Sequence, residues 1–158
     1  MNPLYFTLAS TLSMALAAPH TLAQGTDDKL RTGEQVYRQT CVACHESGVA
    51  HAPRFGDAKA WAPLIEEGQA VLTAHAFVGV RGMPARGGDD KLSLDEFARA
   101  TAYMARQAGG SWQDPDNQLM FSIRTEAQKR LDSEIAAKRK MKKELHRLNQ
   151  AAERARKK

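Results

Sequence analysis

The chain has 158 residues and a formal net charge of +5, and 26% of its residues are charged. This length accommodates one domain, or one small domain with an extension, and excludes several large domains. The charge is uneven, because residues 24–112 carry 10 Lys and Arg against 11 Asp and Glu, whereas residues 113–158 carry 13 against 7. We therefore expect a near-neutral body followed by a basic tail.

Residues 1–23 are typical of a secretory signal peptide. They contain no Lys, Arg, Asp or Glu, they are mostly apolar from Leu4 to Ala18, and Thr21-Leu22-Ala23 provides small residues before a cut at Gln24. The segment is too short and too polar for a good transmembrane helix, and an uncleaved anchor is the alternative. We therefore predict export to the periplasm.

The mature chain begins with a predicted helix over residues 28–39. Leu30, Val36 and Tyr37 fall on compatible helical positions. Gly33 weakens this helix intrinsically and indicates the close approach of another backbone. No convincing alternating strand pattern is found along the chain, so we predict an all-α fold.

The pentapeptide Cys41-Val42-Ala43-Cys44-His45 follows this helix directly. Its spacing is the attachment signature of c-type haem. The two thiols can add across the two vinyl groups of a haem, and His45 then lies beneath the iron. Cys41 and Cys44 are the only cysteines, so a disulfide, a thioredoxin-like pair and a metal site are the alternatives. The adjacent histidine and the lack of a preceding strand favour haem.

The middle of the body is predicted to alternate loops and short helices. Residues 47–56 form a loop, short helical pieces follow Asp57 and break near Pro63, and a helix covers residues 69–78. A glycine-rich loop over residues 79–90 comes next.

The last helix of the body has well-defined predicted ends. Ser93 caps it and Glu96 completes a capping box. Gly109-Gly110 ends it. The tail helix then starts at Asp114 with Pro115 at its first position, and it is long enough to span ~60 Å.

The tail helix carries a thin apolar stripe that Lys138 interrupts. The stripe consists of Met120, Ala127, Leu131, Met141, Leu145, Leu148, Ala152 and Ala155. Three interpretations compete: a solvated charged helix, a helix that docks on a partner subunit or in a coiled coil, and a basic face on anionic lipid or an acidic redox partner. Nucleic acid is a poor candidate for an exported protein.

A second iron ligand decides the chemistry, because a haem with one protein ligand can bind gases, whereas a haem with two mainly transfers electrons. Met83 stands in the loop sequence Gly82-Met83-Pro84, where the proline biases Met83 to an extended backbone. Methionine with histidine raises the reduction potential, and a gap-filling loop methionine is the alternative. The other candidates are placed less favourably: Met1, Met14, Met104, Met120, Met141, His51 and His75.

Together these features resemble a class I c-type cytochrome, most closely the bacterial cytochrome c5 group, over roughly residues 33–108. The resemblance rests on the pentapeptide together with Gly48, Ala52-Pro53, Gly56-Asp57, Trp61, Gly68, Leu72, Gly79, Gly82-Met83-Pro84, Gly87-Gly88, Leu92-Ser93 and Ala102-Tyr103-Met104. It implies four to five helices around one covalent haem, with the first and last helices of the body crossing, so that Gly33 and Tyr37 meet the helix that bears Tyr103.

The resemblance also implies the roles of the site residues. It makes Cys41 and Cys44 the thioether anchors of haem c, His45 the proximal iron ligand and Met83 the distal one. Some relatives carry a second cysteine pair near the methionine loop, which this chain lacks, and the tail has no counterpart in the family pattern.

Two further residues belong to the expected haem environment. Pro53 would pack near His45 and orient its ring, whose other nitrogen needs a carbonyl acceptor; an ordinary loop proline is the alternative. Trp61 would line the haem edge or meet a propionate, and a plain core tryptophan is the alternative. Three basic residues could neutralise the haem propionates but are better interpreted as solvated surface charges: Arg54, Lys59 and Arg86.

We therefore predict a signal peptide (1–23), a cytochrome c domain (24–112) and a basic helical extension (113–158). The predicted function is periplasmic electron transfer between redox proteins, such as a dehydrogenase and an oxidase, with no catalytic residues. The extension would attach the carrier to a partner or to an anionic membrane surface. The alternative is a haem-based sensor or gas-binding module with an open distal site.

Overall fold

Helices make up the regular structure of residues 30–157, which are the residues that the computed structural model describes. Within this range the only β-type pairing is an isolated bridge between Val80 and Met83, so the all-α prediction is confirmed. The predicted signal peptide lies outside the described residues. None of the described helices combines the length and apolarity that a membrane crossing needs.

The first helical segment begins later than the sequence suggested. It starts with α1 (Gly33–Val36), and Leu30 precedes it with 37% of its surface exposed. Thr32 sets this start, because Gln35 N donates to Thr32 Oγ1 at 3.2 Å and Thr32 N donates to the Gln35 side chain at 2.8 Å. This reciprocal capping box satisfies two helix-end donors, and it corrects the predicted start at residue 28.

A π-helical turn, η1 (Tyr37–Cys41), joins α1 to α2 (Val42–His45). Single π-turns of this kind are frequent at functional sites. The turn ends at the first cysteine of the pentapeptide, so the motif itself lies on helical backbone.

Two longer helices and two short turns form the middle of the body. Their bounds are η2 (Val49–His51), α3 (Ala58–Glu66), α4 (Gln69–Val78) and η3 (Ala85–Gly88). The bounds of α4 confirm the prediction. The expected break near Pro63 is absent, because α3 continues through that residue. Pro63 lacks a backbone N–H, so the helix loses one hydrogen bond there but continues on both sides of the proline.

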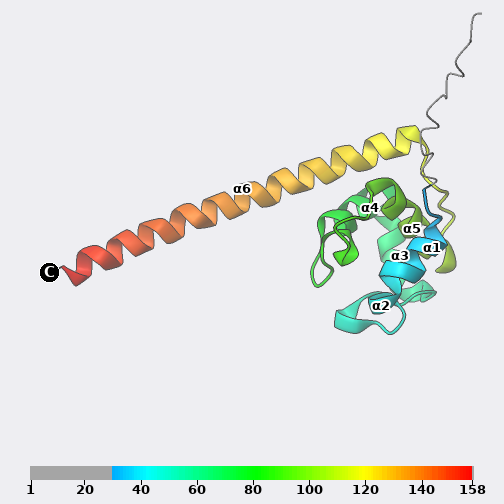
Figure 1. Ribbon diagram of the computed structural model, residues 1–158, viewed down its shortest axis with the longest axis horizontal. Helices are drawn as coiled ribbons and strands as arrows, with labels where there is room; N and C mark the ends of the chain where they lie inside the picture. Colours follow the sequence, from blue (N-terminus) through cyan, green and yellow to red (C-terminus); the bar gives the residue numbers. More distant parts are fainter. Residues whose placement is uncertain (1–29, 158) are drawn as a thin grey trace, which may run out of the picture.

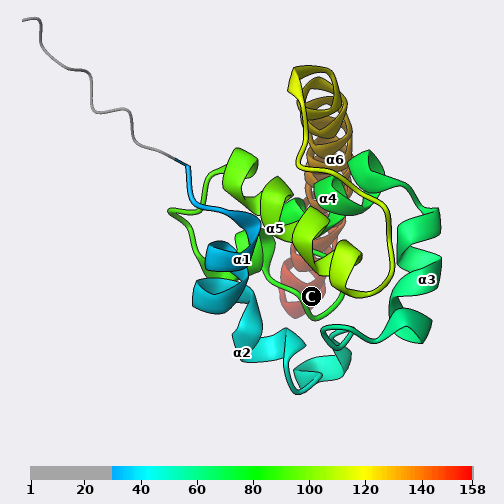
Figure 2. The ribbon, with the colours of Figure 1, turned by 90° about the vertical axis from the view of Figure 1, so that its right-hand side faces the viewer.

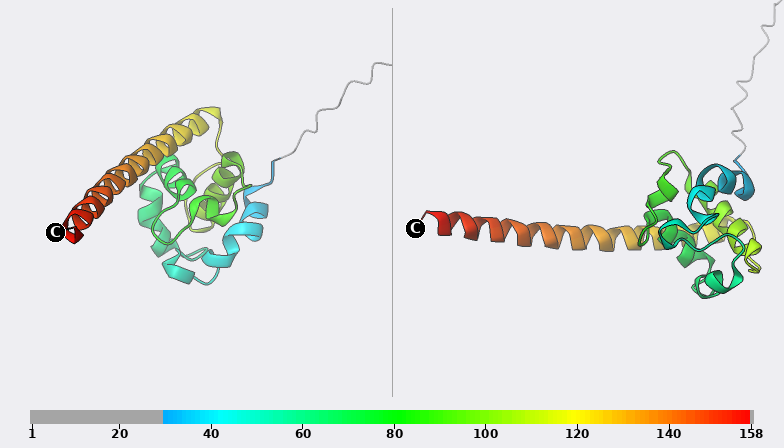
Figure 3. Two further views of the ribbon diagram at one scale, coloured as in Figure 1. Left: turned by 60° about the vertical axis from the view of Figure 1, so that its left-hand side comes forward. Right: turned by 90° about the horizontal axis from the view of Figure 1, so that it is seen from below.

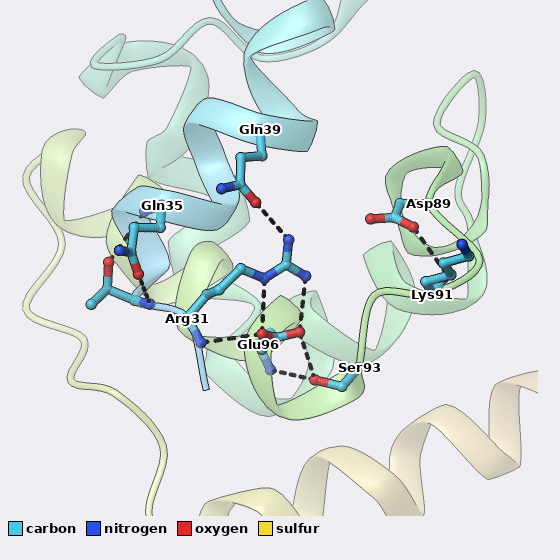
Figure 4. A network of polar contacts seen from close by, with 8 residues as sticks. Arg31, Gln35, Gln39, Asp89, Lys91, Ser93 and Glu96 are labelled. Atoms are coloured by element: carbon cyan, nitrogen blue, oxygen red, sulfur yellow. Dashed lines mark hydrogen bonds and ion pairs between the residues drawn. The ribbon is translucent and has the colours of Figure 1, made fainter. Parts of the chain in front are cut away.

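Helix α5 (Leu94–Gln107) is capped by Ser93, whose hydroxyl accepts from Glu96 N at 3.2 Å. The reciprocal half of the predicted capping box is missing, because the Glu96 carboxylate binds Arg31 instead. Arg31 Nε and Nη2 donate to the two carboxylate oxygens at 2.9 and 3.0 Å, and Arg31 N adds a third bond at 3.1 Å. Figure 4 shows this network tying the residues before α1 to the start of α5.

Helices α1 and α5 cross at close range (Figure 2). A Cβ atom at Gly33 would overlap the carbonyl of Arg99 and lie 2.8 Å from the Cβ of Tyr103. Glycine is therefore required at the crossing, as the sequence indicated. Tyr37 lies beside Tyr103, with ring centroids 5.9 Å apart, which is the predicted meeting of the two helices.

The last helix, α6 (Asn117–Arg156), starts two residues after the predicted proline position. Asp116 caps it by accepting from Leu119 N at 2.8 Å. Asp114, the predicted start, instead lies 3.1 Å from the Arg106 guanidinium of α5. Asp116, which accepts from an N–H of the first turn, is therefore the residue that caps the helix and sets its start.

Helix α6 packs on the body only through its first turns. Met120, Ile123 and Ala127 are buried, and α6 lies along α4. From Ile135 to Arg156 every residue is exposed. Figures 1 and 3 show this outer part projecting well beyond the rest of the described chain.

Candidate functional site

The pentapeptide is anchored by an aromatic cluster beneath it. Tyr37 is 5% exposed and stacks on Phe55 with ring centroids 4.1 Å apart. Its hydroxyl donates to Glu46 Oε2 at 2.8 Å. Burial raises the pKa of the Tyr37 phenol above its usual range, and the hydrogen bond to the Glu46 carboxylate raises it further. Tyr37 is therefore a neutral donor that holds the C-terminal end of α2.

His45 is held in one orientation by the loop that follows it. Its ring is buried, and Nδ1 lies 2.8 Å from the Pro53 carbonyl oxygen. A carbonyl accepts but cannot donate, so Nδ1 is the donor, and in the neutral ring Nε2 has the free lone pair. Phe55 N also donates to the His45 carbonyl at 2.7 Å, which fixes the backbone on the same side.

The two thiols of the pentapeptide differ in exposure. Cys41 is buried and Cys44 is exposed, and neither forms a disulfide. Burial, with a smaller contribution from Cys44, raises the pKa of the Cys41 thiol to about 11. Cys41 is therefore a neutral thiol at neutral pH and has none of the thiolate character of a redox-active cysteine.

Trp61 joins the loop to the core of the site. It is 4% exposed, its Nε1 donates to the Arg54 carbonyl at 2.8 Å, and its ring centroid lies 6.3 Å from that of His45. Trp61 and Cys41 belong to one hydrophobic cluster, which also contains Leu72. The cluster thus supplies an apolar wall beside the histidine.

Met83 packs against the same cluster from the loop between α4 and η3, and its side chain is half-buried. Its loop is a tight turn: Val80 N donates to Met83 O at 3.1 Å, and Met83 N donates to Val80 O at 2.9 Å. Pro84 continues the chain in extended conformation with φ −69° and ψ 156°. Two far-apart segments therefore bring Cys41 and Met83 to one apolar centre.

The other candidate ligands are held by different contacts. His51 is exposed, and His75 lies between Glu67 and Glu126, with ring nitrogens 3.6 and 3.8 Å from their carboxylates. Met104 belongs to the same cluster as Cys41 but lies on the buried face of α5, and Met120 packs against Ala98 in a second cluster. His75 therefore belongs to the contact between α4 and α6.

Sequence reasoning missed three parts of this site. Phe55 was not singled out, and neither was the Tyr37–Glu46 hydrogen bond. The Trp61 bond to the Arg54 carbonyl was also not foreseen. The contacts of Phe55 and of the Arg54 carbonyl depend on the path of the loop over residues 47–56, and that path has no periodic sequence signal. The aromatic residue directly before Gly56 was the available hint.

Comparison with known proteins places the body in one family. The family model described as "Cytochrome C oxidase, cbb3-type, subunit III" matches residues 28–104. Cytochrome c-555 of Chlorobaculum thiosulfatiphilum is 40% identical over 80 residues, which cover 48% of this chain and 93% of that protein. Cytochrome c5 of Azotobacter vinelandii is 34% identical over 77 residues, again covering 48% and 93%.

A solved structure is also similar. A chain in the "Crystal structure of electron transfer complex of nitrite reductase with cytochrome c" is 45% identical and aligns with a TM-score of 0.47 over 48% of this chain and 93% of that one.

The chain belongs to the class I c-type cytochromes. Within this class it is c5-like, with the all-helical cytochrome c fold, and it is a carrier of electrons with one covalent haem c and its iron. The donor set of the site fits this cofactor, because two unbridged thiols and an imidazole lie within one short helical stretch, and the Met83 thioether packs against the same apolar cluster as Cys41. The His45 ring lies beside Trp61 of that cluster.

Proposed function

We propose that this protein is a periplasmic electron carrier whose iron is held between His45 and Met83, and that it is not an enzyme by itself. Cys41 and Cys44 would form the two thioether bonds. The haem, once bound, would accept and release one electron at a time, and no substrate bond would be broken. The protein's own residues orient, bury and tune that group.

The observation that carries this proposal is the fixed orientation of His45. Nδ1 donates to the Pro53 carbonyl oxygen at 2.8 Å, so Nε2 is the nitrogen left for iron. A hydrogen bond of this type also increases the basicity of a ligating histidine. The positioning role of Pro53 therefore follows from its carbonyl rather than from its ring.

Met83 is proposed as the distal ligand because its backbone is fixed on both sides. The paired hydrogen bonds to Val80 and the extended Pro84 fix the backbone from which the thioether projects. A thioether favours the reduced iron and raises the reduction potential. Trp61 would contribute the apolar surroundings that keep water away from the imidazole.

The remaining parts of the proposal concern location and partners. Residues 1–23 would direct export and be removed, residues 24–112 would form the cytochrome domain, and residues 113–158 would extend it. Electrons would pass through an exposed haem edge to redox proteins such as a dehydrogenase or an oxidase. Amino-terminal sequencing of the periplasmic protein tests the export step, with Gln24 as the expected first residue.

Carbon monoxide separates this function from the sensor alternative. Ferrous protein with both axial positions filled gives a low-spin spectrum that carbon monoxide leaves unchanged. An open distal site would bind the gas and shift the spectrum. Rapid carbon monoxide binding by the unmodified ferrous protein would therefore rule out Met83 as ligand and favour a gas-binding module.

A further inference from the structure

The distal arm of α6, residues 135–156, is the largest exposed feature that the site leaves unused. Met141, Leu145 and Leu148 are 68%, 58% and 61% exposed there. Each is within four residues of the next, so the three side chains are neighbours on one helix face. A contiguous apolar strip on an exposed helix marks a contact surface.

This strip faces the same side of α6 as the body. Met141 follows Ile123 by 18 residues, and Leu145 follows Ala127 by the same interval. Eighteen residues complete about five turns at 3.6 residues per turn. Ile123 and Ala127 are buried against the body, so Met141 and Leu145 point to that side beyond it. Figure 1 shows the arm continuing past α4 and the loop that follows it.

The arm and the body therefore form a corner. A shallow recess of about 280 Å³ lies where they part, lined by His75 of α4 and by Glu126, Lys129, Arg130, Ser133 and Glu134 of α6. Figure 3 shows the arm leaving the body from this junction. A molecule that covers the strip lies on the same side of α6 as α4 and the loop that follows it.

This geometry excludes a flat lipid surface as the occupant of the strip. A plane laid along Met141 and Leu145 runs parallel to α6 and meets the body, which projects from the same face. Helices that lie in a membrane interface need their whole apolar face to be accessible to the bilayer. A protein surface of limited width fits the corner where a bilayer does not.

Charge disfavours a second copy and favours an acidic partner. The arm carries eight Lys and Arg against two Glu, so two arms side by side repel each other. The strip is also narrow, because its residues follow one another at alternating intervals of four and three: Met141, Leu145, Leu148, Ala152 and Ala155. This spacing is typical of the contact stripe of a two-stranded coiled coil, which one partner helix can cover.

We propose that the distal arm binds an acidic amphipathic helix of a redox partner protein and holds that protein in the corner beside the Met83 loop. The proposal rests on the electron-carrier function. Binding through the arm makes electron transfer effectively intramolecular and raises the local concentration of the two redox centres. The basic residues speed the first encounter, and salt weakens this effect.

Site-specific crosslinking in the native host tests the docking directly. The full-length holoprotein carries the photo-crosslinking residue p-benzoylphenylalanine in place of Leu145, and a matched protein carries it in place of Lys143 on the opposite face of the arm. We expect position 145 to give an adduct with a redox protein, mapped to a carboxylate-rich helix, and position 143 to give about tenfold less. Adducts to a second copy or to lipid, equal yields, or no adduct would overturn the proposal.

Kinetics with the captured partner provides the second test. Leu145→Gln should lower the second-order rate constant of electron transfer by about tenfold, whereas Lys143→Gln should lower it by less than about threefold. Equal losses would mean that only charge steers the encounter and would contradict a docked strip.

Vesicles test the lipid alternative separately. We expect the parent protein and Leu145→Gln to bind equally to vesicles of phosphatidylglycerol and phosphatidylcholine, because the strip cannot reach a flat bilayer. Weaker vesicle binding by Leu145→Gln would contradict the corner geometry. The absorption spectrum and the response to carbon monoxide should be identical in both proteins, so failure of the docking proposal is distinguishable from failure of the electron-carrier function.

Discussion

The body, residues 30–134, and the distal arm, residues 135–156, are both helical, but different forces hold them. In the body, close crossings, buried side chains and bonds such as Arg31 to Glu96 fix each element. In the arm every side chain is exposed, so the helix depends on backbone propensity and on its attachment to the docked turns. The comparison teaches that the same apolar stripe stabilises the fold where it is covered and remains available for a partner where it is not.

The largest stability effect is expected where the stripe is buried. Ile123→Ala should lower the free energy of unfolding by about 3 kcal/mol, because it leaves a cavity between α6 and the body. Guanidinium denaturation of the holoprotein measures this loss. A change below about 0.5 kcal/mol would mean that the first turns of α6 are not packed as described.

The helix crossing provides the next test. Gly33→Ala should cost about 2 kcal/mol, because the added methyl group overlaps the Arg99 carbonyl. Gly109→Ala is the matched control: Gly109 follows the end of α5, with φ +93° and no atom within 4 Å of an added Cβ. The control should cost about 1 kcal/mol from backbone strain alone. Thermal unfolding of both variants checks the order, and a larger loss at Gly109 would contradict the tight crossing.

The Arg31–Glu96 contact predicts a pH dependence of stability. The Arg31 guanidinium lowers the pKa of Glu96 from 4.5 to about 2. The unfolded chain therefore binds the proton more readily, so the contribution is complete above pH 4.5 and is lost as the pH falls through about 2. We expect about 1–2 kcal/mol from this pair. Glu96→Gln should flatten the acid limb of the stability profile, and an unchanged limb would refute the pair.

The smallest effect is expected in the arm. Leu145→Ala should change the free energy of unfolding by less than about 0.5 kcal/mol, since its side chain is already 58% exposed. Paired denaturation curves of Leu145→Ala and Ile123→Ala sharpen the comparison between the two parts. Equal losses would mean that the arm is packed against something in the isolated protein.

Local signals along the chain predicted much of this molecule. The bounds of α4, the Ser93 cap and the need for glycine at position 33 all follow from residue type and spacing. The pentapeptide and the Met83 loop were found from spacing as well, and the roles proposed for them stay predictions.

The features that were missed depend on competition between partners or on contacts distant in the chain. Thr32 and Asp116 replaced the predicted helix starts, because the side-chain oxygen of each accepts from the N–H three residues ahead. Glu96 left its capping box for Arg31, which is 65 residues away. The packing of α6 on α4 was likewise not predicted, since a stripe alone does not show what covers it.

The most direct test of the account is the distal ligand, measured by the visible spectrum and potential of Met83→Ala beside Met104→Leu. Met83→Ala should lose its low-spin spectrum, bind carbon monoxide in the ferrous form and fall in reduction potential by about 0.1 V or more, within the ~0.8 V range that axial ligands control. Met104→Leu, a conservative change in the core of α5, should keep the parent spectrum and potential. An unchanged spectrum and potential in Met83→Ala would contradict the account.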